Sequence, residues 1–386
     1  MTYDVVICGG GIAGLWLLNV LGNAGYKVLL VEQQALGGTQ TMASQGIIHG
    51  GQKYLLLGNS SAHAQSVGPL PKRWDACLDG VGELDLRGVR ILSDTQVMWP
   101  TSNGLAHLAI RSAAQTFQAK VRRLKIHEVP LALAGLGNVP VYELPERVLD
   151  TASLIKALAV PHGAFIRKGR IEELSQDGRM KVSGVPIKAQ FVICAAGIGN
   201  EALLEQLGVS GIKTQRRPVR QIMIKSMEFP LYGHGVTNSF KPHVTISSHP
   251  LPGGKYVWYL GGGIADDLVP LTDEQAIDFA KWEMKKLFSH LDWEGKQWAS
   301  WHGFRAEAYQ QTGRLPEGPD LQVYGNILVT WPTKLTLTPL LADRVLEHFL
   351  EKGLTQKNST FKPRQQNIEQ ISLARYPWEI ANWRNY

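Results

Sequence analysis

The start of the chain constrains the fold more than any other feature. An apolar, β-branched run over residues 4–8 leads into a glycine turn with the spacing Gly9-x-Gly11-x-x-Gly14. Leucines follow at helical spacing, and a second apolar run ends at Glu32, 18 residues after Gly14. This order of strand, glycine turn, helix, strand and acid predicts the opening unit of a doubly wound α/β domain that binds a dinucleotide.

Each residue type in this pattern has a physical reason. Gly9 allows a tight turn, Gly11 lets the backbone approach a pyrophosphate at the helix N-terminus, and Gly14 lets helix and strand pack closely. A carboxylate in the position of Glu32 can accept hydrogen bonds from both hydroxyls of an adenosine ribose. An ordinary glycine-rich turn requires none of these flanking elements, so we expect a dinucleotide site.

Length and composition fit a soluble globular protein. The chain has 386 residues, of which 44% are hydrophobic and 19% charged, enough for one large domain or two intertwined ones. It contains no run of about 18 apolar residues, so we expect no transmembrane segment. The first strand begins at residue 4 and leaves no room for a signal peptide. We therefore expect a cytoplasmic protein, with peripheral attachment at the inner membrane face as the alternative.

The cysteines and histidines do not show the spacing of metal ligands, so we expect no metal. Cys8 and Cys194 lie in apolar, strand-like runs and are predicted to be small buried hydrophobic residues. His243 and His249 flank a predicted strand, and we interpret both as hydrogen-bonded structural histidines.

Nucleotide-binding pieces alternate with β-rich segments along the chain. A buried strand over 191–194 ends in a turn at Gly197, and another over 326–330 precedes a helix with Thr338 at its N-cap. Gly261-Gly-Gly is interpreted as a β-turn, because no second ribose acid follows it.

We expect a mixed α/β (α+β) fold: a Rossmann-like nucleotide-binding domain with an interleaved β-rich substrate domain. The predicted boundaries are 1–70, 150–212 and 300–352 for the first domain, 71–149 and 213–299 for the second, and 353–386 for a linker and C-terminal tail. Further helices are predicted over 104–117, 201–207 and 273–288.

Three segments join the opening fingerprint in a resemblance to a known family. They are SQGIIHGGQKY over 44–54, the turn Ala195-Ala-Gly197, and WHGFRA over 301–306 followed by GRLP over 313–316. The chain resembles the flavoprotein superfamily of D-amino-acid oxidase, glycine oxidase and sarcosine oxidase. The segment 44–54 is similar to one in glycerol-3-phosphate and L-2-hydroxyglutarate dehydrogenases. The resemblance covers most of residues 1–350 and implies that the first domain binds FAD without a covalent link.

The resemblance also places the last helix beside the flavin pyrimidine. Backbone amides, Lys334 and the helix dipole there would stabilise the negative charge of a reduced flavin. The residues to which the resemblance assigns FAD binding are Gly9, Gly11, Ile12, Ala13, Gly14, Glu32, Gln33, Thr41, Ser44, Gln45, Gly46, His49, Ala195, Ala196, Gly197, Arg305, Thr333, Lys334, Leu335 and Thr336.

His49 has three interpretations. It contacts the flavin without a covalent link, it acts as a catalytic base, or it anchors the flavin covalently. Proteins with a covalent anchor usually carry tryptophan before the histidine, whereas Ile48 precedes His49. We therefore rank non-covalent contact first, the base second and the anchor last.

The resemblance implies hydride transfer to flavin N5 from a C–H beside an amine or hydroxyl of a small, anionic substrate. Arg305 would hold the anionic group with its planar guanidinium, unless it forms a structural salt bridge with Glu307 or another acid. Tyr54 and His302 are further candidates for substrate contact. The expected electron acceptor is oxygen or a quinone.

The formal net charge of +7 leaves two alternatives open. One is a flavoenzyme that acts on a modified nucleic-acid base, which we do not favour because no recognition motif accompanies the basic residues. The other is a peripheral membrane dehydrogenase that reduces quinone. The residues that would bind phosphates in the first alternative are Arg122, Arg123, Lys125, Arg216 and Arg217.

Overall fold

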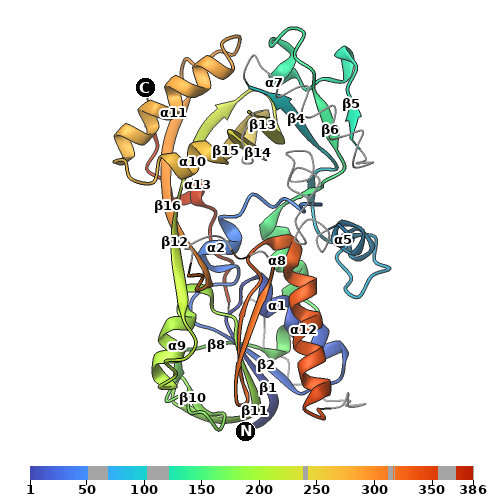
Figure 1. Cartoon of the computed structure of the whole chain (residues 1–386), viewed down its shortest axis with the longest axis vertical. Coiled ribbons are helices and arrows are strands. Elements are labelled where there is room, and N and C mark those ends of the chain that lie inside the picture. Colours follow the sequence, from blue (N-terminus) through green and yellow to red (C-terminus); the bar gives the residue numbers. More distant parts are fainter. Residues whose placement is uncertain are drawn as a thin grey trace.

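The computed structural model describes residues 1–50, 68–101, 121–237, 242–311, 316, 318–354 and 371–385. Within these residues two large sheets occupy opposite ends of an elongated molecule (Figure 1). The mixed α/β fold predicted from the sequence is confirmed. Every helix in these ranges is too short or too polar to cross a membrane.

The first sheet is built around the opening strand. β1 (Thr2–Cys8) lies parallel between β2 (Val28–Glu32) and β11 (Val185–Cys194), so the carboxyl ends of these strands meet at one edge. β8 (Ile166–Lys168) extends the sheet beyond β2, and β18 (Ile327–Trp331) extends it beyond β11. The other strands of this sheet are β9 (Ile171–Glu172), β10 (Arg179–Val182) and β17 (Asp320–Tyr324).

Helices cover both faces of this sheet. α1 (Ile12–Asn23) is buried on nearly all sides, because it packs against the sheet, α8 (Thr151–Ala159) and α12 (Thr338–Glu351). α9 (Asn200–Gln206) covers the opposite face through Leu203 and its neighbours. The other helices in the described ranges are α2 (Gly38–Met42), α5 (Leu70–Leu78), α7 (Leu131–Ala134), α10 (Gly263–Asp267), α11 (Asp273–Leu287) and α13 (Pro377–Ile380). Single 3-10 turns are η1 (Ile126–Glu128), η2 (Gly163–Phe165), η3 (Gly197–Gly199), η4 (Pro252–Gly254) and η5 (Leu335–Leu337).

A long antiparallel ribbon joins the first sheet to the second. It consists of β12 (Thr214–Met227) and β16 (Gln297–Ala308), which run the length of the molecule between the two ends (Figure 1). The other strands of the second sheet are β4 (Gln96–Pro100), β5 (Arg122–Arg123), β6 (Tyr142–Leu144), β13 (Gly233–Val236), β14 (Val244–Pro250), β15 (Tyr256–Gly261) and β19 (Arg384–Asn385). β3 (Ile91–Ser93) and β7 (Val148–Leu149) form a separate two-stranded sheet.

The second sheet has an outer and an inner face. α11 covers the outer face, and Trp258 of β15 packs there against Phe288 with ring centroids 5.4 Å apart. Side chains alternate along a strand, so Tyr259 points to the inner face, toward the first domain.

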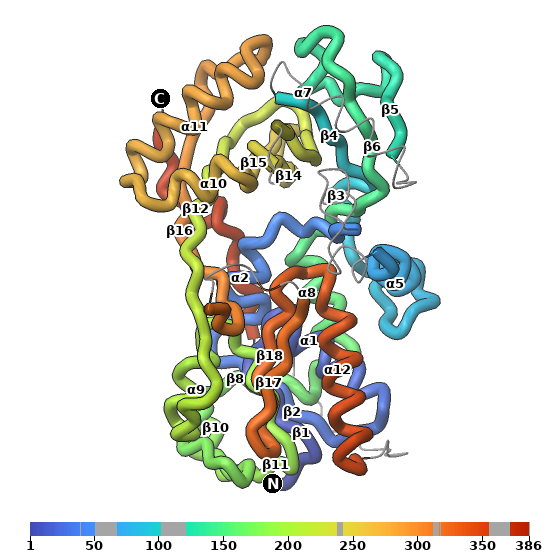
Figure 2. Tube along the Cα trace, in the orientation of Figure 1, coloured from blue at the N-terminus to red at the C-terminus, as the bar shows by residue number. Residues whose placement is uncertain are grey.

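The C-terminal tail, residues 371–385, contacts both the region of the first sheet and the second sheet (Figure 2). Its first part lies along Leu36, whose backbone N–H donates to Ser372 O (3.0 Å). The ring of Trp378 then packs against His249 of β14, with centroids 4.0 Å apart. The tail therefore docks on its own chain and covers part of the inner face of the second sheet.

The structure corrects two local predictions. Thr338 is the first residue of α12 and not its N-cap, and its hydroxyl donates to Leu335 O (2.9 Å). Gly261-Gly-Gly is not a simple β-turn, because Gly262, with φ of 85°, leads from β15 directly into α10. Cys8 and Cys194 are buried as predicted. The helix predicted over 104–117 and residues 355–370 of the predicted linker and tail lie outside the described residues.

Candidate functional site

The glycine turn after β1 is tightly packed at Gly14 but has room beside the backbone of Gly11. A Cβ on Gly14 would lie 1.9 Å from Gly9 O, so helix and turn touch there. A Cβ on Gly11 would meet only Thr41 Oγ1, at 3.4 Å. The same hydroxyl accepts the backbone N–H of Ile12 (3.2 Å). Thr41 therefore orders the first turn of α1, and the backbone at Gly11 remains open to a ligand. Ala13 completes the first turn of α1 and is buried.

Glu32 stands at the end of β2, beside this turn. Its carboxylate accepts the backbone N–H of Gly10 (2.7 Å) and of Gln34 (2.8 Å). Gln33 is exposed next to it. Two N–H donors fix the carboxylate at the edge of the turn, where the predicted role needs an acceptor for ribose hydroxyls.

The segment 44–50 runs from the edge of the first sheet to the residues that precede α12. Ser44 N–H donates to Thr41 O (3.1 Å), and Gly46 O accepts the N–H of Leu149 (2.9 Å). His49 N–H donates to Thr336 Oγ1 (2.7 Å). His49 and the segment 333–336 are therefore in direct contact.

The segment 333–336 precedes α12 and has an unusual backbone. Thr333 has φ of 58°, a conformation that favours glycine, and its hydroxyl hydrogen bonds to Gly318 O (3.1 Å). Lys334 and Leu335 follow directly, and the N-terminus of α12 comes next. A helix N-terminus at this place would favour negative charge on a bound ring.

The turn after β11 lies against the ribbon. Ala195 N–H donates to Cys8 O (2.9 Å), which joins this turn to the end of β1. Ala196 N–H donates to the side chain of Asn200 (2.9 Å). A Cβ on Gly197 would lie 4.0 Å from the side chain of Ala306, the residue after Arg305. Five separate stretches of sequence thus converge at the carboxyl edge of the first sheet: 9–14, 32–33, 44–50, 195–197 and 333–336. We call this arrangement the cradle.

Gln45 joins this cradle to the inner face of the second sheet. Its side-chain amide donates to Tyr259 O (3.0 Å) and Thr245 O (3.2 Å). The Tyr259 hydroxyl donates to Ala43 O (2.9 Å). Burial raises the pKa of Tyr259, and the positive charge of Arg305 opposes that rise. Tyr259 therefore stays protonated. The charge of Arg305 acts on the Tyr259 hydroxyl, which lies on the inner face.

Arg305 is exposed on β16, opposite Arg217 of β12. Glu307, the acid considered as its salt-bridge partner, is bound by Arg217 (2.8 Å) and by Gln215 (3.0 Å). Arg217 therefore holds the ion pair with Glu307.

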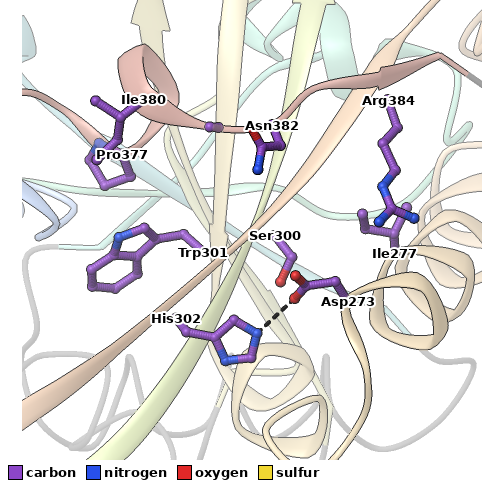
Figure 3. A pocket seen from close by; sticks show the side chains of 10 residues that line it. Asp273, Ile277, Ser300, Trp301, His302, Pro377, Ile380, Asn382 and Arg384 are labelled. Carbon is purple, nitrogen blue, oxygen red and sulfur yellow. Dashed lines mark hydrogen bonds and ion pairs between the residues drawn. The ribbon is translucent and has the colours of Figure 1, made fainter.

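The structure does not bring His302 to this cradle. Its Nε2 lies 2.7 Å from Asp273 Oδ1, at the start of α11 (Figure 3). Both line a cavity of about 200 Å³ between the ribbon and the C-terminal tail, with Asn382 and Arg384 on the tail side. The alternation of β16 explains the position, because residues 302 and 305 differ by an odd number and point to opposite faces. Tyr54, the other predicted substrate contact, lies outside the described residues.

A buried polar cluster stands beside the cradle. His49 Nδ1 lies 3.5 Å from Oε2 of Glu146, which is fully buried between β6 and β7. His234 of β13 is also buried, and its ring centroid is 6.1 Å from that of His49. One nitrogen or oxygen of each of the three lies within 4.8 Å of the others.

Comparison with known proteins identifies the family. Residues 4–333 match the family described as FAD dependent oxidoreductase (DAO). The chain belongs to the FAD-dependent oxidoreductases. This confirms the family predicted from the four segments, with FAD as the cofactor.

Similar proteins support the assignment. The oxidoreductase is 40% identical to the probable FAD-dependent oxidoreductase PA4991 of Pseudomonas aeruginosa, over 99% of this chain and 98% of that protein. The crystal structure of PA4991 matches with a TM-score of 0.84 and covers 98% of both chains. Glycine oxidase from Geobacillus kaustophilus matches with a TM-score of 0.62 at 16% identity, over 97% of this chain and 99% of that one. The FAD-bound L-α-glycerophosphate oxidase from Mycoplasma pneumoniae gives 0.64 at 15% identity, over 97% and 100%. The last two share the fold.

The cradle of this oxidoreductase fits FAD. The open backbone at Gly11 and the N-terminus of α1 suit the pyrophosphate, and the oriented carboxylate of Glu32 suits the adenosine ribose. Segment 44–50 and the residues before α12 contact each other through His49 N–H and Thr336 Oγ1, and their assignment to the flavin end of the cofactor stays a prediction.

Sequence reasoning missed Glu146 and His234. Both lie in the predicted β-rich domain, outside any recognised motif, and they reach His49 only through the chain's topology. In the sequence, only the residue types glutamate and histidine could have indicated a buried cluster, since acids and imidazoles in β-rich segments are rarely buried without a partner.

Proposed function

We propose that this oxidoreductase removes a hydride from the carbon next to a hydroxyl, or alternatively an amine, of a small anionic substrate. The hydroxyl is the better fit. The observation that carries this choice is the 3.5 Å approach of His49 Nδ1 to the buried carboxylate of Glu146. Oxidation of an alcohol needs a group that takes the hydroxyl proton, whereas an amine can react through its own lone pair.

The pair of His49 and Glu146 has the arrangement of a base and its orienting acid. A carboxylate beside Nδ1 favours the tautomer with the proton on Nδ1, which leaves the Nε2 lone pair to accept a proton. Glu146 is itself held by Gly50 N–H (2.7 Å) and by the Gln96 side chain (3.2 Å), so it can hold the imidazole in one orientation.

The reaction balances with these groups. FAD, when bound, supplies the hydride acceptor at N5. Nε2 of His49 takes the hydroxyl proton while the C–H bond breaks, so that the alcohol carbon becomes a carbonyl. Arg305 holds the anionic group of the substrate through its planar guanidinium, and its position on the ribbon beside Ala306 and Gly197 supports this role. The electron acceptor that completes the cycle is oxygen or a quinone.

The nucleic-acid alternative receives little support from the basic residues. Arg122 pairs with Glu128 (2.6 Å), and Arg216 pairs with Glu201 (2.6 Å). Arg217 pairs with the buried Glu307. These pairings use charges that a phosphate backbone would need. These ion pairs therefore favour a small substrate over a nucleic acid.

Anaerobic flavin bleaching tests the proposal. Purified holoenzyme is mixed with 2-hydroxy acids, glycerol phosphate, small amino acids and N-methyl amino acids, and the flavin absorbance is followed. We expect a hydroxyl compound to bleach the flavin, and His49→Gln to slow that reduction by about 10²–10⁴-fold. Bleaching by amines alone, at an equal rate in His49→Gln, would overturn the base role. No bleaching by the panel, with FAD reducible by dithionite, would favour a larger substrate.

A further inference from the structure

We propose that His49, Glu146 and His234 form a binding site for one divalent transition-metal ion of the zinc class. Three elements supply the ligands: the segment 44–50, the loop between β6 and β7, and strand β13. Two imidazoles and one carboxylate are a ligand set that binds zinc and related ions and leaves a position open.

The spacing of the three side chains suits such an ion. Ligands at Zn–N and Zn–O bond lengths of about 2.0–2.1 Å in tetrahedral geometry stand about 3.3 Å from one another. His49 Nδ1 and Glu146 Oε2 are 3.5 Å apart, and all three ligand atoms lie within 4.8 Å. Small side-chain movements would complete the coordination.

Neighbouring groups orient two of the three ligands. Thr245 Oγ1 lies 2.9 Å from His234 Nδ1, which directs His234 Nε2 to the cluster. Gly50 N–H and the Gln96 amide hold the two oxygens of Glu146. Such hydrogen bonds to the distal atoms of ligands fix their orientation and raise metal affinity.

Charge and access also favour a cation here. Glu146 and His234 are fully buried, and a buried carboxylate is stabilised by a positive partner. The side chain of His49 is 19% exposed, which gives an ion access to the cluster from the side of His49.

Metal binding has a consequence that rests on the proposed function. A neutral imidazole that binds a metal through Nδ1 carries its proton on Nε2 and has no lone pair left there. The metal would therefore remove the base that we assign to His49. Occupancy of the site would inhibit hydroxyl oxidation without displacing FAD.

Direct metal binding tests the site. Untagged, chelator-treated holoenzyme is titrated with Zn²⁺ in competition with a chromophoric chelator. We expect one tight equivalent per chain, lost in Glu146→Gln and in His234→Ala. His243→Ala is the matched control, because His243 also pairs with a glutamate, Glu283, at 3.2 Å but lies outside the cluster. Absence of a tight equivalent, or equal binding by His234→Ala and His243→Ala, would overturn the site.

A second measurement needs no variant. Zinc-edge anomalous diffraction from crystals of the wild-type holoenzyme soaked in Zn²⁺ should place a peak between the three side chains, and peaks elsewhere alone would overturn the proposal. Substrate reduction of the flavin should fall by about 10²-fold with zinc bound, while dithionite reduction stays unchanged. Zinc bound at the cluster with undiminished substrate reduction would confirm the metal site and contradict the base role of His49.

Discussion

His49 Nδ1 lies 3.5 Å from Oε2 of Glu146, and the backbone N–H of Gly50 donates to the other oxygen of the same carboxylate. One carboxylate thus contacts both the ring of His49 and the backbone that follows it. This double contact fixes the position of His49 relative to the segment 333–336, to which its own N–H donates through Thr336.

Glu146→Gln removes the negative charge of this residue and keeps the shape of its side chain. The amide can donate to Nδ1, which would place the imidazole proton on Nε2 and remove the base. We expect the rate of flavin reduction by substrate, measured by stopped-flow absorbance, to fall by about 10²-fold or more. FAD content should remain that of the wild type. Glu143→Gln is the control, because Glu143 is more exposed and pairs with Arg122 (3.2 Å). A wild-type reduction rate in Glu146→Gln would contradict the pairing.

Arg305→Ala should weaken substrate binding. A hydrogen bond to a charged group contributes about 1.5–3 kcal/mol, so KM for the anionic substrate should rise about 10–150-fold. Arg305→Lys should recover part of the loss, because lysine keeps the charge but not the planar fork. Steady-state kinetics check this, with Arg216→Ala as the control for loss of a surface arginine. An unchanged KM in Arg305→Ala would remove Arg305 from the substrate site.

FAD could be predicted as the cofactor because the signals of its binding unit are local. Glycine spacing and Glu32 lie within one βαβ unit, whose strands are neighbours in the sheet. The cluster at His49 depends on contacts between distant segments. Glu146 and His234 reach His49 through a domain whose strand order, β13 beside β4 and β4 beside β6, has no sequence signature. His302 was expected at the site because of its proximity to Arg305 in sequence. Side chains alternate along β16, so His302 points to the opposite face and contacts Asp273.

Two glycines of the fingerprint should respond differently to alanine. Gly14→Ala forces a methyl group to within 1.9 Å of the Gly9 carbonyl oxygen, so it should reduce soluble yield and flavin content together. Gly11→Ala meets only Thr41 Oγ1 at 3.4 Å and should fold, as circular dichroism of the apoprotein would show. Its methyl group occupies the approach of the pyrophosphate, so FAD affinity should fall about tenfold or more, which corresponds to about 1.4 kcal/mol. Fluorescence titration with FAD measures this, and an unchanged affinity would place the pyrophosphate elsewhere.

Trp378→Ala should show how much the tail stabilises the fold. Trp378 is 8% exposed, stacks on Tyr376 with centroids 4.3 Å apart, and lies 5.3 Å from Tyr259. Truncation of a buried tryptophan costs about 3–5 kcal/mol of unfolding free energy. Urea denaturation measures the loss, and Trp282→Ala on the exposed side of α11 should change stability by about 0.5 kcal/mol or less. Equal midpoints for the two variants would mean that the tail is not docked in solution.

His249 should make the folded state sensitive to acid. Burial lowers its pKa to about 3; the charge of Arg90 adds to this effect, and that of Asp150 opposes it. The unfolded chain binds a proton at the ordinary histidine pKa of about 6.5, so between these values it holds more protons than the folded chain. Stability is therefore retained above about pH 6.5 and falls as the pH decreases toward 3. At pH 5 the shift corresponds to about 2 kcal/mol.

His249→Gln removes this titrating group while keeping a polar side chain. The loss of unfolding free energy between pH 7 and pH 5, from urea denaturation, should be about 2 kcal/mol smaller in the variant than in the wild type. Asp150 accepts the N–H of Ser153 (2.8 Å) and pairs with Arg90, so its pKa is lowered despite burial, and it contributes to the acid response of both proteins. His162→Gln is a second variant for the same measurement, because burial also lowers the pKa of His162. The Nε2 atom of His162 lies 3.0 Å from Oδ1 of Asn23, at the end of α1. If His249→Gln loses as much stability as the wild type over this range, His249 is protonated in the folded protein and its packing against Trp378 does not exclude the charge.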